Sequence, residues 1–335
     1  AGAARPAPRR RRGVSAPLSP ASPRTAGERS ARSPETWAVR TARFWRTVNR
    51  LADATEAVSA VGATPADAVF ARDRVTLWRY RPQAAPRPVP PVLIVHGFIG
   101  RASITDLAPG RSLVADLAEA GVDVYTIHWG EPSRADRFLR IEDYLEDHLD
   151  ACIRHVTRAA GRAPVMPGVC EGGVFSTCYA ALEPARLSGL ALTITPIDCH
   201  ADPDAVLRRW VRAFSPSELA RLVDSLGGLP GAAMAGAFQA MTPGRTMAKY
   251  TTGLAALADD PAGMTTFLQM EAWLRDRPDH PGEAAKQMLI EHYHENRLAR
   301  GVWALGGRRI DLAALRLPGL DAWGMHDGVV PRRCA

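Results

Sequence analysis

Short apolar segments of strand character recur along the chain, with longer helical patterns between them. Val75 to Tyr80 alternates apolar and polar residues as a half-buried strand does, and Val92 to Val95 is an apolar run typical of a buried parallel strand. Further strand patterns lie at 122–127, 165–169, 190–195 and 320–323, and helical patterns lie at 112–120, 141–156 and 174–182. This alternation predicts an α/β fold with a mostly parallel sheet and helices on both faces.

Three parts of the chain depart from this alternation. Residues 1–35 consist mainly of Ala, Pro, Arg, Ser and Gly without apolar periodicity, so we expect a disordered tail. An amphipathic helix is expected at 36–60, at the start of one folded domain that runs over 36–335. From about 199 to 300 the strand pattern lapses into helical sequence interrupted by Pro and Gly, which predicts a helical cap inserted into that domain.

The net charge of the chain is concentrated in the tail. The formal net charge is +7, and residues 1–35 contribute +6 of it through eight Arg and two Glu. The rest of the chain is nearly neutral and offers no extended basic groove. We therefore expect no nucleic-acid partner for the folded domain.

Cysteine spacing and hydropathy argue against disulfide-rich, metal-binding and membrane-spanning proteins. The five Cys residues show neither a CxxC pair nor Cys/His ligand spacing, so we expect no disulfide framework, no metal site and a reduced, cytoplasmic setting. The longest uncharged stretch, Ser225 to Gly244, contains Pro230 and Pro243 and many small residues, so we expect no transmembrane segment.

A candidate nucleophile follows the predicted strand at 165–169. Gly168-Val-Cys170-Glu-Gly172 has the GxCxG pattern of a nucleophile elbow with Cys in place of Ser, at a strand-to-helix turn. Gly168 and Gly172 fit this turn because side chains next to a strained nucleophile would clash. The nearby helix N-terminus favours a thiolate. We predict Cys170 as the nucleophile, with a buried Cys in a Gly-rich turn as the alternative.

A second candidate segment follows the strand at 92–95. In such folds the loop after this strand supplies one amide of the oxyanion hole, and the residue after the nucleophile supplies the other. His96-Gly97-Phe98 stands in that position, so the backbone amides of Phe98 (or Ile99) and Glu171 are the candidates. His96 itself is expected to shape the loop. A simple tight turn is the alternative.

The candidate acid follows the last predicted strand. Such folds order their catalytic groups as nucleophile, acid and histidine, and Asp327 occupies the acid position in His326-Asp-Gly328. A turn-forming Asp is the alternative. No His follows Asp327, so we expect the catalytic His to be absent from the chain and a C-terminal strand and helix to be missing. Asp198 with His326 is a remote alternative pair.

Taken in order, these motifs resemble the catalytic subunit of class III polyhydroxyalkanoate synthases over residues 37 to 335. The resemblance lies in the elbow around Cys170 together with flanking segments at 61–65, 106–107, 111–113, 129–130, 134–137, 195–196, 270–271, 306–309 and Asp327. The chain departs from the family at Pro167, in the strand before the elbow, and at His96-Gly97.

The resemblance implies an α/β-hydrolase-type catalytic domain over 36–335 with a cap over its site. The implied activity is polymerisation of (R)-3-hydroxyacyl-coenzyme A to a polyester through an acyl thioester on Cys170, with release of coenzyme A. Asp327 would help to activate the 3-hydroxyl of the incoming unit, and the family places its catalytic histidine in a Gly-Gly-His segment. The coenzyme A thioester is the substrate, so no cofactor and no metal is implied.

The resemblance also implies a second synthase subunit, an oligomer and attachment to the surface of polyester granules in the cytoplasm. Two other functions stay open. The chain could be a Cys-dependent thioesterase or esterase of the same fold, or an inactive truncated homologue that serves as an interaction subunit.

Overall fold

The computed structural model describes residues 39, 42, 61–257 and 259–335. The chain divides into two compact units, residues 1–41 and 42–335, and the second is described below. The predicted disordered tail at 1–35 lies outside the described residues, as does nearly all of the predicted helix at 36–60.

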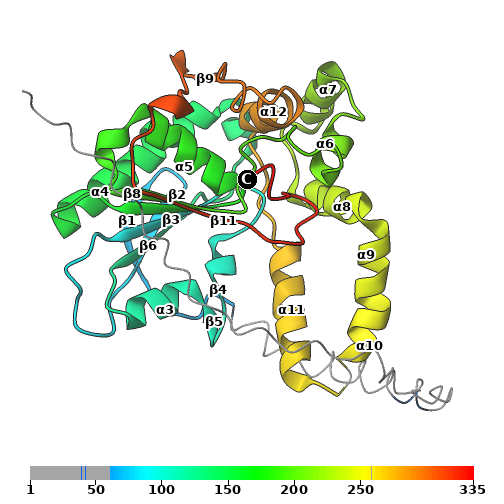
Figure 1. The fold of residues 1–335 in the computed structure, drawn as a ribbon, viewed down its shortest axis with the longest axis horizontal. Helices are drawn as coiled ribbons and strands as arrows, with labels where there is room; N and C mark the ends of the chain where they lie inside the picture. Colours follow the sequence, from blue (N-terminus) through cyan, green and yellow to red (C-terminus); the bar gives the residue numbers. More distant parts are fainter. Residues whose placement is uncertain (1–38, 40–41, 43–60, 258) are drawn as a thin grey trace, which may run out of the picture. The chain divides into compact units, whose positions relative to one another are not determined.

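A seven-stranded sheet forms the centre of the second unit, in the order β1-β2-β6-β3-β7-β8-β11 (Figure 1). Its strands are β1 (Asp67–Arg72), β2 (Val75–Tyr80), β3 (Val92–His96), β6 (Val124–His128), β7 (Val165–Val169), β8 (Gly189–Thr193) and β11 (Gly319–Ala322). Strands β1 and β2 pair antiparallel, as do β2 and β6, and every other pairing is parallel. The predicted mostly parallel sheet is confirmed, with an antiparallel hairpin at one edge.

Helices cover both faces of this sheet, as the pattern predicts. Helix α3 (Leu113–Glu119) packs on one face through Val114, which lies in a buried cluster with Ile94 of β3. Helices α4 (Asp150–Ala160) and α5 (Glu171–Leu182) belong to the large core cluster, which includes the neighbouring β3 residues Leu93 and Val95. Successive β3 side chains therefore enter opposite layers, as the two-residue period of a strand requires. Figure 1 shows α3 and α5 on opposite sides of the sheet.

Pro167 is accommodated inside the central strand β7. The β7–β8 ladder includes Pro167 opposite Ala191, whereas the β3–β7 register passes from the Val92–Val165 pair to the Val95–Gly168 pair. Proline has no N–H to donate to a ladder. The gap in the pairing with β3 spans this position, so the strand keeps its place in the sheet.

The segment between β8 and β11 is mostly helical. Its helices are α6 (Val206–Val211), α7 (Pro216–Leu226), α8 (Gly231–Met241), α9 (Pro243–Ala248), α10 (Leu254–Ala256), α11 (Pro261–Arg275) and α12 (Gly282–Lys286), with π-helical turns at Lys249–Gly253 and Gln287–His294. Ser215 caps α7 by accepting from the Glu218 amide, and Pro216 occupies the first helical position. The role of this segment as a cap over the site stays a prediction.

Smaller elements complete the described chain. They are the strands β4 (Asp106–Ala108), β5 (Arg111–Ser112), β9 (Ala304–Leu305) and β10 (Arg308–Arg309), the 3₁₀ turns Ala102–Thr105, Arg134–Phe138, Pro184–Arg186 and Leu312–Ala314, and a π-helical turn at Asp143–Leu149 that leads into α4.

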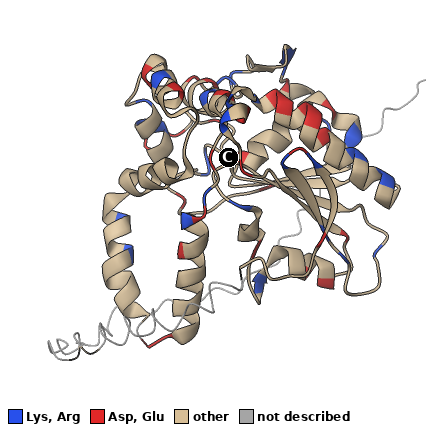
Figure 2. Cartoon of the chain, turned by 180° about the vertical axis from the view of Figure 1, so that it is seen from behind, with Lys and Arg blue, Asp and Glu red and all other residues tan. Residues whose placement is uncertain are grey.

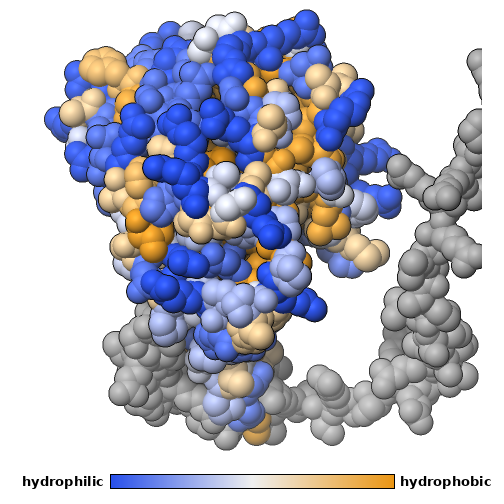
Figure 3. Space-filling view, turned by 90° about the vertical axis from the view of Figure 1, so that its left-hand side faces the viewer, coloured by the Kyte–Doolittle hydropathy of each residue, from blue (hydrophilic) through white to orange (hydrophobic). Residues whose placement is uncertain are grey.

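The surface mixes both signs of charge. In Figure 2, segments of Lys and Arg and segments of Asp and Glu are interspersed along the helices and loops, and the face in Figure 3 is largely hydrophilic with smaller apolar patches between the polar residues. Among the described residues, no helix is long and apolar enough to cross a membrane.

Candidate active site

Cys170 stands at the turn between β7 and α5, where the GxCxG pattern predicts an elbow. Its backbone angles are φ 53° and ψ −120°, and φ lies in the left-handed region that non-glycine residues rarely adopt. Such a conformation costs about 1–3 kcal/mol and persists only where the surroundings hold it. Here the Cys170 N–H donates to the Thr193 carbonyl of β8 at 2.9 Å, and the Cys170 carbonyl accepts from Gly173 N–H at 2.9 Å.

The glycines of the elbow are needed for space. A Cβ on Gly168 would lie 2.5 Å from Gly173 Cα, and a Cβ on Gly172 would lie 2.4 Å from the Val95 carbonyl oxygen of β3. These contacts involve backbone atoms, which cannot swing aside as a flexible side chain can. The helix and the two strands therefore meet at a distance that only glycine permits.

The surroundings of the Cys170 thiol favour its neutral form. Burial, followed by the neighbouring charge of Glu171 and then that of Asp327, raises the pKa of Cys170 to about 12. A hydrogen bond from the Glu171 amide and the positive charge of Arg277 act in the opposite direction. The expected stabilisation of a thiolate by the helix N-terminus is thus outweighed in this structure by burial and by like charge.

The loop after β3 points two amides at one oxygen atom. Glu171 Oε2 accepts from Phe98 N–H at 2.6 Å and from Ile99 N–H at 3.2 Å. Glu171 is only 1% exposed, and burial raises its carboxyl pKa to about 7 against the opposing effect of these two hydrogen bonds. Of the amides predicted for the oxyanion hole, those of Phe98 and Ile99 are therefore already bonded to the side chain of Glu171, the residue that follows the candidate nucleophile.

His280 lies beside the same carboxylate. Its Nε2 is 3.8 Å from Glu171 Oε2, too far for a hydrogen bond, and its ring packs edge-on against the ring of Phe98. Burial and, to a smaller extent, the positive charge of Arg277 lower the pKa of His280 to about 3. His280 is accordingly a neutral imidazole at pH 7, as is buried His96, whose pKa burial lowers to about 4.

Asp327 follows β11 and lies close enough to Cys170 for its charge to act on the thiol. Its Oδ1 accepts from the amides of Val329 at 2.8 Å and Val330 at 3.0 Å. Asp327 therefore forms a turn, as the alternative interpretation states, and its charge also acts on the Cys170 thiol. The remote pairing of Asp198 with His326 is not seen, since Asp198 Oδ1 accepts instead from the Asn296 amide group at 2.8 Å.

Residues in the last turn of α11 and directly after it attach the loop of residues 97–101 to the helical segment. Arg277 Nη1 donates to the Ile99 carbonyl at 2.9 Å, and Trp273 Nε1 donates to the Arg101 carbonyl at 3.0 Å. Arg101 also pairs with Asp276 at 2.6 Å. The carbonyl groups of this loop are thus held from the helical segment, while its amides are held by Glu171.

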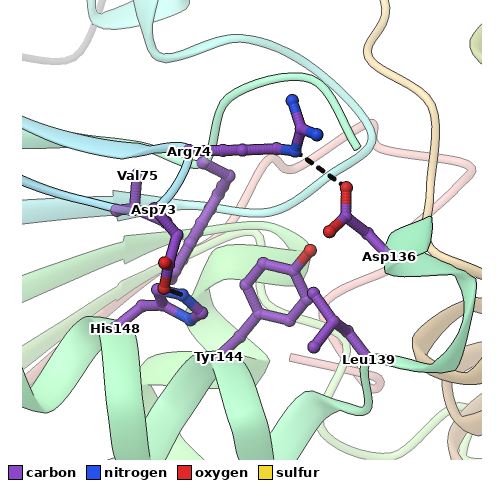
Figure 4. A pocket seen from close by; sticks show the side chains of 8 residues that line it. Asp73, Arg74, Val75, Asp136, Leu139, Tyr144 and His148 are labelled. Carbon is purple, nitrogen blue, oxygen red and sulfur yellow. Dashed lines mark hydrogen bonds and ion pairs between the residues drawn. The ribbon is translucent and has the colours of Figure 1, made fainter. Parts of the chain in front are cut away.

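A separate cavity of about 470 Å³ is lined by residues 73–75 and by side chains from the segment 129–148 (Figure 4). Arg74 pairs with Asp136 at 2.8 Å and His148 with Asp73 at 3.1 Å along its lining, and Tyr144 projects between them. Tyr144 packs against Phe98 on its other side, at 4.8 Å between ring centroids. None of the predicted site residues lines this cavity.

The sequence pattern did not predict three groups of the candidate site: the Glu171 side chain, Arg277 and His280. Glu171 was predicted only through its amide, and nothing in the local pattern around Arg277 and His280 distinguishes them from other residues of a helical segment. Arg277 lies 178 residues from its partner Ile99, so only the folded chain brings the two together. In the parts of the chain that the structure describes, no three His, Cys, Asp or Glu side chains gather as a metal-ligand set.

Comparison with known proteins identifies the class of this fold. Residues 90–333 match the family model of the alpha/beta hydrolase fold, so the chain belongs to that family. The strand-to-helix elbow with a central nucleophilic residue type is typical of it.

Within that class the relatives are polymerases. The chain is 35% identical over 273 residues to the poly(3-hydroxyalkanoate) polymerase subunit PhaC of Allochromatium vinosum, which covers 81% of this chain and 76% of the relative. It is 36% identical over 275 residues to the protein of the same name from Synechocystis, covering 81% and 72%, and 33% identical over 301 residues to that of Haloferax mediterranei, covering 86% and 60%. The chain belongs to the poly(3-hydroxyalkanoate) polymerase family, a family of acyltransferases.

Proposed function

We propose that this chain polymerises (R)-3-hydroxyacyl units from their coenzyme A thioesters, with Cys170 as the acylated nucleophile. The observation that carries the proposal is the position of Cys170: it stands in a strained elbow, directly before Glu171, whose side chain binds the Phe98 amide, and within reach of the charge of Asp327. A nucleophile, an electrostatic site for an oxyanion and an acid are the parts that acyl transfer requires.

The first half-reaction forms the acyl-enzyme. The Cys170 thiol loses its proton, and Sγ attacks the thioester carbonyl carbon, so that the carbonyl oxygen becomes an oxyanion at the amides of Glu171 and Phe98. The carbon–sulfur bond to coenzyme A then breaks, and coenzyme A leaves as a thiol with the proton that Cys170 released. One thioester replaces another, so the step involves little change in bond energy.

The second half-reaction extends the polyester. The 3-hydroxyl oxygen of another unit attacks the acyl carbon on Cys170, an ester bond forms, and the hydroxyl proton returns to Sγ. Asp327 assists the activation of this hydroxyl. Transfer to a hydroxyl exceeds transfer to water if the helical segment from 199 to 300 excludes water from the site.

Because the Cys170 thiol is neutral, the proposed reaction needs a base that accepts its proton. The family resemblance assigns this role to a histidine of a Gly-Gly-His segment, and no His follows Asp327 in this sequence. We further propose that the chain acts with a second synthase subunit at a granule surface, which the naming of its relatives as subunits supports.

The test compares the chain with its Cys170→Ala variant on 3-hydroxybutyryl-coenzyme A. We expect coenzyme A release and polymer when the Gly-Gly-His segment of a family member supplies the base, and a loss of at least about a thousandfold when that extended chain carries Cys170→Ala. Cys152→Ala, in α4, is the matched control for loss of a buried thiol. Free 3-hydroxybutyrate without polymer would identify a thioesterase instead.

A version of the chain that is extended by the Gly-Gly-His segment of a family member tests whether the reaction needs a base. The Cys170→Ala variant tests whether the reaction needs Cys170. If Cys170 acquires no acyl group in either version, the proposal is wrong and an interaction subunit is the remaining function.

A further inference from the structure

The Glu171 side chain occupies a position that acyl transfer needs for the substrate. Two backbone N–H groups that converge on one oxygen atom are the arrangement by which enzymes bind an oxyanion. In this structure the converging donors are those of Phe98 and Ile99, and the oxygen is Glu171 Oε2. The anion in the site is therefore one that the protein itself supplies.

Gly97 shows that the loop is built around this side chain. A Cβ on residue 97 would lie 2.4 Å from both Glu171 Cβ and Glu171 Oε2. The φ of Gly97 does not lie in the left-handed region, so space rather than backbone conformation calls for glycine here. The glycine of the His96-Gly97-Phe98 segment thus has a specific use, which is to leave room for the Glu171 carboxylate at the amides.

The carboxylate also acts on the nucleophile. Its charge is the second cause, after burial, of the raised pKa of the Cys170 thiol. The groups that face this pair from the surrounding elements are the neutral imidazole of His280, the phenol of Tyr293, the carboxylate of Asp327 and the guanidinium of Arg277. Arg277 brings the only positive charge among these four groups.

We propose that Glu171 is a built-in competitor for the oxyanion site, whose carboxylate occupies the Phe98 and Ile99 amides until substrate displaces it. The proposal rests on the proposed function for its meaning in catalysis, but the occupancy itself is a property of the free protein. Under this proposal Glu171 has two roles: its backbone amide helps to bind the oxyanion, and its side chain competes for the same site. The thioester carbonyl oxygen can bind the Phe98 amide only after the carboxylate has moved away.

The test measures how Cys170 discriminates between two alkylating reagents of similar size, iodoacetamide and iodoacetate. Both react with the thiolate, so the ratio of their rates is independent of the thiol pKa. Iodoacetate carries an anion beside the reacting carbon, whereas iodoacetamide carries a neutral amide. In the unchanged chain the Glu171 carboxylate repels that anion and occupies the amides that would bind it.

In Glu171→Ala we expect the iodoacetate-to-iodoacetamide rate ratio at Cys170 to rise about tenfold, the effect of removing one like charge at short range. Glu171→Gln should give a smaller rise, because its amide oxygen still accepts from Phe98 but carries no charge. Glu183→Ala, which removes a carboxylate at the other end of α5, should leave the ratio unchanged. Peptide mapping assigns the label to Cys170, and unlabelled Cys152 and Cys178 report an intact fold.

Two results would overturn the inference. An unchanged ratio in Glu171→Ala would mean that the carboxylate does not occupy an anion site, and slower labelling by both reagents would mean that Glu171 only supports the loop. The alkylation needs no coenzyme A substrate. A raised ratio in a chain that releases no coenzyme A would therefore support this inference while contradicting the proposed function.

Discussion

The buried carboxyl of Glu171 should make the stability of the fold depend on pH in a way that Glu171→Gln removes. Burial raises the pKa of Glu171 from an ordinary value of 4.5 to about 7. Between these two values the folded protein keeps a proton that the unfolded chain has already released. The free energy of unfolding therefore falls as pH rises through this window, because ionisation costs more in the folded state.

The size of the effect follows from the two pKa values. Each pKa unit by which the folded and unfolded states differ corresponds to about 1.4 kcal/mol. The ionisation of Glu171 thus reduces the stability by on the order of 3 kcal/mol between about pH 4.5 and pH 7. Gln at this position cannot ionise, yet its amide oxygen can still accept from the Phe98 N–H.

Urea unfolding of both proteins at roughly pH 5 and pH 8 measures this difference. Other titrating groups are common to the two proteins and cancel when the pH dependence of one is subtracted from that of the other. We expect the unchanged chain to lose on the order of 3 kcal/mol more than Glu171→Gln over this range. Parallel pH dependences would refute the reasoning, and a larger loss in the Gln variant would reverse its sign.

Three further predictions concern the residues around the elbow. Gly172→Ala places a Cβ 2.4 Å from a backbone oxygen of β3. This variant should lose about 3 kcal/mol of the free energy of unfolding in urea, or fail to fold. A urea midpoint equal to that of the unchanged chain would contradict the packing argument. Arg277→Met removes the positive charge that lowers the pKa of Cys170. Iodoacetamide labelling of Cys170 should therefore slow about threefold to tenfold at fixed pH, and the midpoint of its pH profile should move to higher pH. A move of the midpoint to lower pH would contradict this reasoning. Tyr179→Phe removes a hydroxyl that donates to buried Asp150 at 2.7 Å. The free energy of unfolding in urea should fall by about 1.5–3 kcal/mol, and a fall below about 0.5 kcal/mol would show that the hydrogen bond contributes little.

Local sequence patterns predicted the framework of the fold well. The segments predicted as strands at 75–80 and 165–169 coincide with β2 and β7, and the strand at 320–323 differs from β11 by one residue at each end. Strands β2 and β7 bury at least one face, so their composition shows it directly, whereas all four residues of β11 are exposed. The edge strand β1 was missed because Asp67–Arg72 is at most partly buried, with exposed residues at both ends, and lacks a strong apolar pattern.

The elbow could also be predicted locally, with one difference. The helix was expected from 174, whereas α5 begins at Glu171, directly after Cys170. Gly172 and Gly173 weaken the helical pattern in sequence, but the close approach of β3 and of Thr195 requires glycine at both positions. Tertiary packing therefore decided a boundary that intrinsic helix propensity would place later.

The sequence by itself determined what depends on neighbouring residues: the alternation of strands and helices, the strained turn at Cys170 and the position of Asp327 after the last strand. The tertiary structure decided what fills the space above Cys170. The Phe98 amide and the Glu171 carboxylate are 73 residues apart, and Arg277 comes from a helical segment still further along the chain. Local periodicity carries no information on such pairs, since burial and charge at a site are properties of all the elements that meet there. The same GxCxG pattern is compatible with a neighbouring loop whose amides are free and with one whose amides bind the Glu171 carboxylate, and only the fold distinguishes the two.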